Sequence, residues 1–257
     1  MDLLIPVKLK NNPMDFNEYI KTINTEQTSS LNYIRSEEVQ WSVPGSLKIK
    51  VSDAGVLLPF YGDTTVIPLE QSDFEPANQF QTELRNNLEG MFAEPLLPEH
   101  FHITLHDLSN GPEEAPLKNQ MESNAQKCRE IFDNARNYFE KHPEYRTVKL
   151  HSTYVYNSCN ISAVLGFAPA SDRDYKLIMN LYNFFDDVVY LNYWLRMHLT
   201  LSYFTTKEFT KSEVHKMAKV MDDINNSRKI SIELDLMKLA YQRFYSMNDY
   251  RTVFHVG

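Results

Sequence analysis

A short alternating phrase occurs twice in the chain and constrains its fold more than any other feature. The chain reads Phe-His-Ile-Thr-Leu-His around His102 and Met-His-Leu-Thr-Leu-Ser around His198. In an extended strand successive side chains point to opposite faces. His102 and Thr104 therefore share one strand face, as do His198 and Thr200, and apolar side chains occupy the opposite faces. The phrase predicts two strands that each bury one face and present an imidazole and a hydroxyl on the other.

The elements predicted around the two phrases form a duplicated layout, in which each phrase lies on a strand between helices. Apolar alternation predicts strands at 47–51, 56–59, 64–69, 100–108, 147–156, 161–167, 194–204, 230–239, 241–246 and 252–256. Helical periodicity predicts helices at 14–23, around 80–92, at 117–141, and after the capping boxes at 171–174 and 210–213. Short connections favour antiparallel pairing. We therefore expect an α+β fold of two packed lobes over residues 46–257, preceded by an N-terminal extension, residues 1–45.

Charge and apolar content limit the class of ligand. The 257 residues are 42% hydrophobic, which is enough to build one large domain or two small lobes. The net charge of −8 argues against a broad basic surface for long nucleic acid. A small nucleotide or short RNA-type anion held in a local pocket fits this charge, and we expect the chain to act as a monomer.

The remaining composition points to a reducing, cytoplasmic setting without a membrane segment. Two cysteines, Cys128 and Cys159, form neither a disulfide framework nor a metal-binding pair by their spacing. The apolar run within residues 1–10 is too short for a signal peptide. No stretch approaches the ~20 apolar residues of a membrane helix. Only seven glycines are present, and no glycine-rich phosphate loop is found.

Paired histidines and threonines suit phosphodiester cleavage. The unperturbed pKa of histidine lies closest to neutrality, so two histidines can act together as general base and general acid. In-line displacement at phosphorus needs the two groups on opposite sides of the phosphate. A threonine hydroxyl two residues further along each strand can donate to a non-bridging phosphate oxygen. This chemistry needs no metal or other cofactor, and the sequence offers no convincing cluster of metal ligands.

The tetrapeptides that begin at His102 and His198 resemble the H-x-[S/T]-x motifs of the 2H phosphoesterase superfamily. The strand and helix order matches that superfamily over residues 46–257, and residues 45–66 are more similar to a little-characterised bacterial branch than to the tRNA-ligase-type members. The resemblance implies a bilobal fold with a pseudo-twofold axis and a central groove. It also implies that His102 and His198 act as acid and base, that Thr104 and Thr200 bind phosphate, and that the substrates are 2′,3′-cyclic or 2′-5′ linked nucleotide phosphoesters.

Other residues are further candidates for metal or substrate binding. His100 and His106 share the face of His102 if the strand is regular, which raises the alternative of a zinc site. Three neighbours on one strand converge poorly on a tetrahedral ion. We therefore expect His106 to line the groove or meet solvent. Candidates for substrate binding, each with an ordinary structural alternative, are Arg196, Tyr61, Tyr154 and Tyr156.

Three functions remain open from the sequence. The first is a metal-independent phosphodiesterase, a hydrolase of cyclic phosphates or RNA ends. The second is a non-catalytic module that binds a nucleotide or RNA end in the same cleft. The third is a histidine-dependent hydrolase or ligase acting on another phosphoester. Which histidine is base and which is acid is also open, as is the substrate's base.

Overall fold

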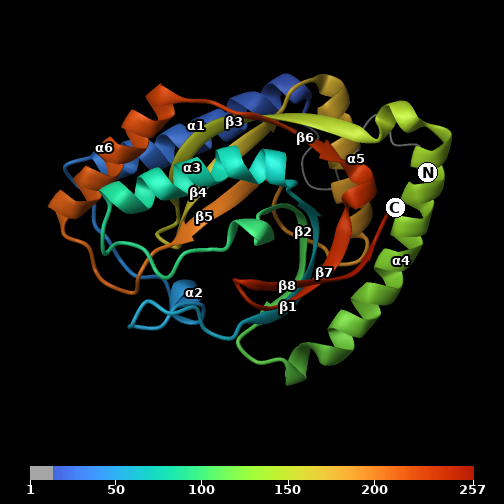
Figure 1. Cartoon of the computed structure of the whole chain (residues 1–257), viewed down its shortest axis with the longest axis horizontal. Helices are drawn as coiled ribbons and strands as arrows, with labels where there is room; N and C mark the ends of the chain where they lie inside the picture. Colours follow the sequence, from blue (N-terminus) through green and yellow to red (C-terminus); the bar gives the residue numbers. More distant parts are fainter. Residues whose placement is uncertain (1–13) are drawn as a thin grey trace.

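The protein, described here as a computed structural model over residues 14–257, contains two four-stranded antiparallel sheets flanked by helices (Figure 1). The helices are α1 (Phe16–Arg35), α2 (Gly45–Lys48), α3 (Gln71–Asn87), α4 (Lys118–Lys141), α5 (Asp172–Asp186) and α6 (Lys211–Ser227). The strands are β1 (Tyr61–Pro68), β2 (His102–Gly111), β3 (Thr147–Ser158), β4 (Ser162–Pro169), β5 (His198–Tyr203), β6 (Ser231–Asp235), β7 (Ala240–Ser246) and β8 (Asp249–His255). The predicted bilobal α+β class is confirmed.

The two sheets have corresponding strand orders. The first sheet runs β2-β1-β7-β8 and the second runs β5-β4-β3-β6. Each motif strand, β2 or β5, is therefore an outer strand of its own sheet, and the two motif strands contact each other across the boundary between the lobes. The first sheet joins the early strands β1 and β2 to the late strands β7 and β8, whereas the second sheet is built from the consecutive strands β3 to β6.

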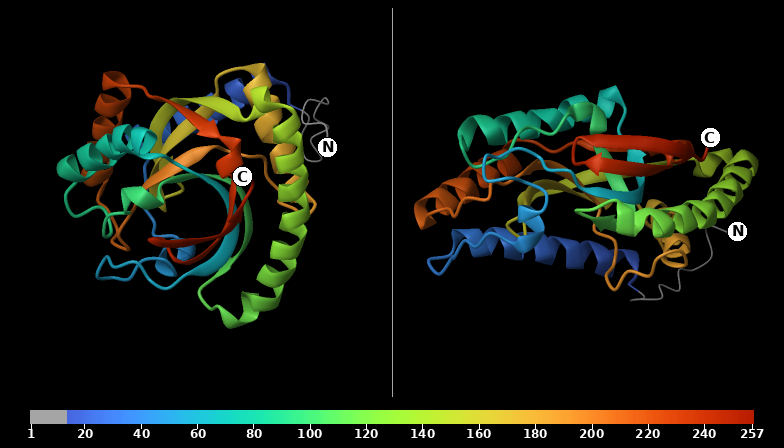
Figure 2. Two further views of the ribbon diagram at one scale, coloured as in Figure 1. Left: turned by 45° about the vertical axis from the view of Figure 1, so that its right-hand side comes forward. Right: turned by 90° about the horizontal axis from the view of Figure 1, so that it is seen from below.

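Helices cover the sheets on several sides. The apolar face of α4 packs along the first sheet, which curls beside it in the left view of Figure 2. In the second sheet, α1 and α3 lie on opposite sides of the strands (Figures 1 and 2). No helix within residues 14–257 is both long and apolar enough to cross a membrane.

Helix α1 is longer than the sequence predicts. The Asp15 side chain caps its first turn by accepting from the Glu18 amide at 2.8 Å, and the helix continues to Arg35. The predicted end at Ile23 is wrong: threonine and serine after it lower helix propensity, but burial of one helix face outweighs that cost. Residues buried on that face, in the same core as the sheets, are Tyr19, Ile23, Gln27, Leu31 and Ile34. Whether residue 45 marks a domain boundary stays a prediction.

The segment before β1 also differs from its prediction. Residues 47–51 and 56–59 were expected to form a hairpin, but the chain forms α2 and then a loop closed by a single bridge between Val51 and Leu57. Leu47 and Val51 lie four residues apart and both are buried, which suits a helical turn as well as a strand. The second motif strand is also shorter than 194–204, since regular pairing starts at His198.

A β-bulge follows the first motif. Thr104 and His106 pair with successive residues of β1, so Leu105 has no partner across the sheet. A bulge inserts one residue and turns the following side chains to the other face. His106 therefore points away from the face that carries His102, and Asp107 takes the place that a regular strand would give to His106.

The second motif has the same bulge at the same position. Thr200 and Ser202 pair with successive residues of β4, which leaves Leu201 without a partner. Tyr203 consequently shares the face of His198 and Thr200. The pseudo-twofold relation between the lobes thus extends to a local backbone irregularity, three residues after each histidine.

The orientation of His106 corrects one prediction. Its ring was expected to line the groove or meet solvent, but it is 1% exposed. Its Nε2 lies 3.0 Å from Asp186 Oδ1 of α5, and its Nδ1 lies 2.6 Å from the Asp107 carbonyl oxygen. Burial lowers the pKa of His106, and Asp186 opposes that shift. The pair joins β2 to α5 behind the groove.

We expect His106→Ala to lower the free energy of unfolding by about 3 kcal/mol, because it removes the imidazole partner of a buried carboxylate. Urea denaturation followed by circular dichroism measures this change. The matched control is His100→Ala, which removes a partly exposed ring and should cost less than about 0.5 kcal/mol. Equal stability of the two variants would show that the buried pair contributes nothing.

Candidate active site

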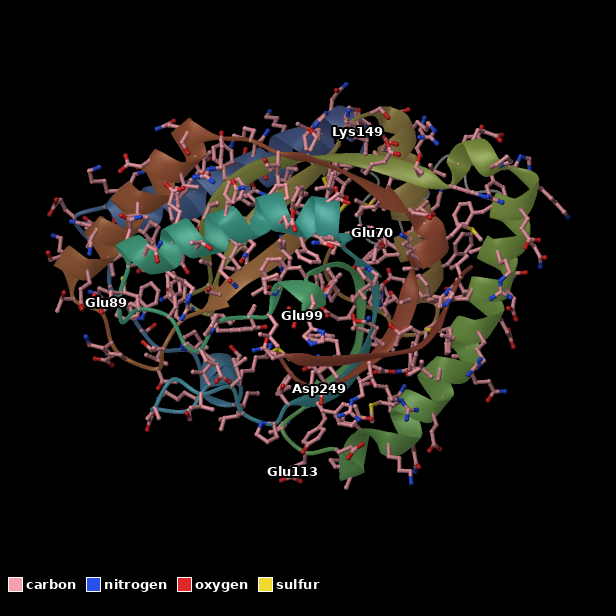
Figure 3. All side chains as sticks on the ribbon, viewed as in Figure 1. Glu70, Glu89, Glu99, Glu113, Lys149 and Asp249 are labelled. Atoms are coloured by element: carbon pink, nitrogen blue, oxygen red, sulfur yellow. The ribbon has the colours of Figure 1, made fainter. Side chains whose placement is uncertain are left out.

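The two motifs meet at one groove between the lobes. His102 and Thr104 of β2 and His198 and Thr200 of β5 all line a cavity of about 260 Å³. The same four side chains also line a smaller cavity of about 40 Å³ on the side of Leu96. The structure therefore brings together the four residues that the sequence singled out. In Figure 3 the labels Glu99 and Asp249 mark the turn η1 (Pro98–His100) and the start of β8, two segments that border this groove.

Both histidines are held in the same way. His102 Nδ1 lies 2.7 Å from the His100 carbonyl oxygen, and His198 Nδ1 lies 2.8 Å from the Arg196 carbonyl oxygen. A carbonyl oxygen only accepts, so each Nδ1 carries the proton and donates it. Nε2 of neither ring has a hydrogen-bond partner among the described residues. A neutral ring in this tautomer offers Nε2 as a proton acceptor, and a protonated ring offers Nε2–H as a donor.

The environment of His102 favours its neutral form. Burial lowers the pKa of His102 from the ordinary 6.5 to about 4, and the neighbouring His198 and His100 add to the shift. The His100 carbonyl and Asp107 act against it. The ring of His102 also lies against Tyr250, with 4.7 Å between ring centroids. At neutral pH His102 is therefore an uncharged base.

Aromatic hydroxyls close the groove beside the histidines. Tyr203 donates to Met247 Sδ at 3.0 Å, and Tyr250 lies 3.7 Å from the same sulfur. Burial raises the pKa of both tyrosines, so both phenols stay neutral. The loop that carries Met247 joins β7 to β8, so the far end of the first sheet contributes to the same groove.

Two charged residues of the groove were missed from the sequence. Lys50 comes from the loop after α2, with its Nζ 4.7 Å from the Phe60 ring centroid and 5.6 Å from that of Tyr203. Burial lowers the pKa of Lys50, and Asp107 opposes the shift. Asp107 reaches the groove only because of the Leu105 bulge. A strictly alternating strand would turn Asp107 away from the groove, so the sequence pattern does not identify it. No local sequence signal identifies Lys50.

The weaker candidates lie elsewhere. Arg196 contributes its carbonyl to His198, but its side chain points to α1 and binds Glu26 at 2.6 Å and 3.1 Å. Tyr156 lines a separate cavity together with Arg196. Tyr61 packs edge-on against Tyr245, and Tyr154 lies under the Lys229 ammonium. None of the four predicted substrate-binding candidates lines the groove.

The geometry of the first motif strand does not suit a metal site built from His100, His102 and His106. His106 faces away from His102, so the three histidines of the first motif do not converge. Within residues 14–257 no group of three or more histidine, cysteine, aspartate or glutamate side chains is placed to hold a metal ion.

Comparison with known proteins supports the fold. No protein-family model matches the chain. No curated protein matches it either. Among solved structures, the fold is similar to that of ATU0111, a conserved protein of unknown function from Agrobacterium tumefaciens str. C58, with a TM-score of 0.59 and 15% sequence identity over 88% of this chain and 98% of that chain. At this identity the similarity concerns the fold alone.

We expect the imidazole of His102 to titrate near pH 4, charged below that pH and neutral above it, because burial and neighbouring histidines disfavour its cation. Carbon-13 NMR of labelled histidine, assigned with His102→Ala, measures the midpoint. In His198→Ala the midpoint should rise, since His198 is one cause of the lowering. A midpoint above pH 6 in the unmodified protein would contradict the assignment.

Proposed function

We propose that this chain is a metal-independent phosphodiesterase of the 2H type that hydrolyses a small cyclic or 2′-linked nucleotide phosphoester. One observation carries the proposal: two histidines on related strands offer unpartnered Nε2 atoms to one groove, each with a threonine of the same strand face beside it. A structural histidine pair would have both ring nitrogens engaged, as His106 has.

The two histidines take different roles in the proposed reaction. Neutral His102 accepts a proton at Nε2 from the attacking water as its oxygen bonds to phosphorus. His198 donates a proton from Nε2 to the oxygen that leaves as the phosphorus–oxygen bond breaks. Thr104 and Thr200 donate hydroxyl hydrogen bonds to the non-bridging oxygens, where negative charge increases. The low pKa of His102 is the reason for assigning it as the base.

The size and charge of the groove support a small phosphoester. A cavity of about 260 Å³ is below the usual range for a whole drug-sized ligand, but it accommodates a phosphate and part of a sugar. Lys50 places one ammonium group in this groove. Asp107 places one carboxylate there as well, so the ammonium group and the two threonine hydroxyls are suited to bind one phosphodiester charge rather than several.

Replacement of either histidine by alanine should lower kcat/KM for a 2′,3′-cyclic nucleotide by about 1000-fold, because it removes a positioned acid or base. Thr104→Val and Thr200→Val keep the shape but remove the hydroxyl, and each should cost about 100-fold. The matched control is His151→Ala, an exposed histidine of β3 that contacts Ser231 at 2.7 Å, which should leave kcat/KM unchanged. Full activity in either histidine variant, or activity that chelator removes and a divalent metal restores, would exclude the mechanism.

The pH dependence tests the assignment of His102 as base. Protonation of His102 removes the base, so kcat/KM should fall on the acidic side with a midpoint near pH 4 and stay high at pH 5.5. Stopped assays of 2′,3′-cyclic nucleotide hydrolysis between pH 3.5 and 8 measure this limb. An acidic limb near the ordinary histidine pKa of 6.5 would instead assign another group as base.

A non-catalytic binding module is the alternative that uses the same groove. It predicts that cyclic nucleotides bind without release of product. Titration of the protein with all four 2′,3′-cyclic nucleotides, followed by chromatography of the mixture, separates the two functions, since turnover converts the ligand and binding alone does not.

A further inference from the structure

A second and larger cavity lies between α1 and the second sheet. Its volume is about 690 Å³, which is within the range of small-ligand sites. We call it the α1 cavity. Helix α1, which lies along the strands in the right view of Figure 2, forms one wall with Glu26, Gln27 and Tyr33. Tyr156 of β3 and Arg196, which precedes β5, contribute to the other wall.

The α1 cavity contains a buried polar atom without a partner. Gln27 is 5% exposed, and its Oε1 has no hydrogen-bond partner among the described residues. A buried carbonyl oxygen without a donor is energetically costly. Gln27 lines the cavity, so a rotation of its side chain would turn this oxygen toward a ligand N–H there.

Gly166 of β4 fixes the position of this amide. A Cβ on Gly166 would lie 2.4 Å from Gln27 Nε2 and 2.6 Å from Thr153 Oγ1, so only glycine lets α1 approach the sheet this closely. Gly166 pairs with His198 across the sheet, and directly opposed residues share a face. Helix α1 and its cavity therefore lie on the sheet face that carries His198.

The α1 cavity and the catalytic groove are neighbours that share one lining residue. Ser158 lines both. Val164 of β4 pairs with Thr200 on one side and Tyr156 on the other, so these three side chains form one row across the sheet. Neighbouring strands lie about 4.8 Å apart, which places Tyr156 about 10 Å from Thr200. A nucleoside attached to a phosphate can bridge that distance.

The chemistry of the lining suits a nucleobase. Tyr156 and Tyr33 offer aromatic faces for stacking. Burial raises the pKa of Tyr156 to about 12, so its hydroxyl remains a neutral donor and acceptor. The Arg196 guanidinium is held by both Glu26 oxygens, so the cavity has little free positive charge to bind a second phosphate.

We propose that the α1 cavity binds the nucleoside part of the substrate, with Gln27 Oε1 accepting from an N–H of the base, while the phosphate lies between the histidines. This inference rests on the proposed function for the position of the phosphate, but nucleoside binding by the cavity can be tested without turnover. Gln27 and Tyr156 then determine which base is accepted.

The unmodified protein allows a direct test, because Cys159 lines the α1 cavity and is exposed whereas Cys128 is buried. A maleimide should therefore label Cys159 first, at a rate that mass spectrometry of tryptic peptides follows. Saturating adenosine, guanosine, cytidine or uridine should slow this labelling at least 5-fold for the preferred base. Ribose 5-phosphate, which carries no base, should not protect. Absence of protection by all four nucleosides would overturn the proposal.

Calorimetry on variants gives the second test. Gln27→Leu keeps the side-chain volume, removes the acceptor, and should raise the Kd of the preferred nucleoside at least 10-fold. The matched control is Gln126→Leu on the exposed side of α4, which should leave the Kd unchanged. Thermal unfolding checks that both variants are folded; if Gln27→Leu is not, Tyr156→Ala replaces it with the same expectation. Wild-type affinity in a folded variant of Gln27 and in a folded variant of Tyr156 would overturn the proposal.

The two proposals fail in different ways. If nucleosides protect Cys159 and bind through Gln27, but no phosphodiester is turned over, the α1 cavity is a nucleoside site and the proposed reaction is wrong. If cyclic nucleotides are hydrolysed but nucleosides neither bind nor protect, the reaction stands and the α1 cavity does not hold the base.

Discussion

The unpaired leucines of two β-bulges determine which side chains face the groove. Without the bulges at Leu105 and Leu201, strict alternation would place His106 and Ser202 beside Thr104 and Thr200. With them, Asp107 and Tyr203 occupy those places, and His106 becomes available to bind Asp186 behind the sheet. The shape of the groove, the charge near the histidines and the contact between β2 and α5 all depend on these single insertions.

The site is symmetric in its backbone and asymmetric in its surroundings. Each histidine is fixed by a carbonyl two residues earlier, so both Nε2 atoms are presented in the same way. The fifth residue after each histidine differs, a carboxylate in one lobe and a phenol in the other. Tyr250 packs against the ring of His102. The two lobes thus hold their histidines in the same way but surround them with different side chains.

Much of this architecture could be predicted from the sequence because it depends on local patterns. The alternation around His102 and His198 predicts both motif strands, and the capping box of Thr210 and Glu213 marks a helix start that the structure contains. The features that could not be predicted depend on contacts between distant segments. The end of α1 at Arg35 is set by burial against β3 and α6, and Lys50 reaches the groove from a loop whose apolar spacing suits a strand equally well.

The packing of α1 has a consequence for how the protein is made. The helix is complete at Arg35, but its sheet partner β3 begins at Thr147, more than 100 residues later. At a synthesis rate of about 5–20 residues per second, the ribosome needs on the order of 10 s to produce that partner. During this interval Ile23, Leu31 and Ile34 have no strand to cover them. The nascent chain therefore exposes the apolar face of this amphipathic helix before its docking site exists.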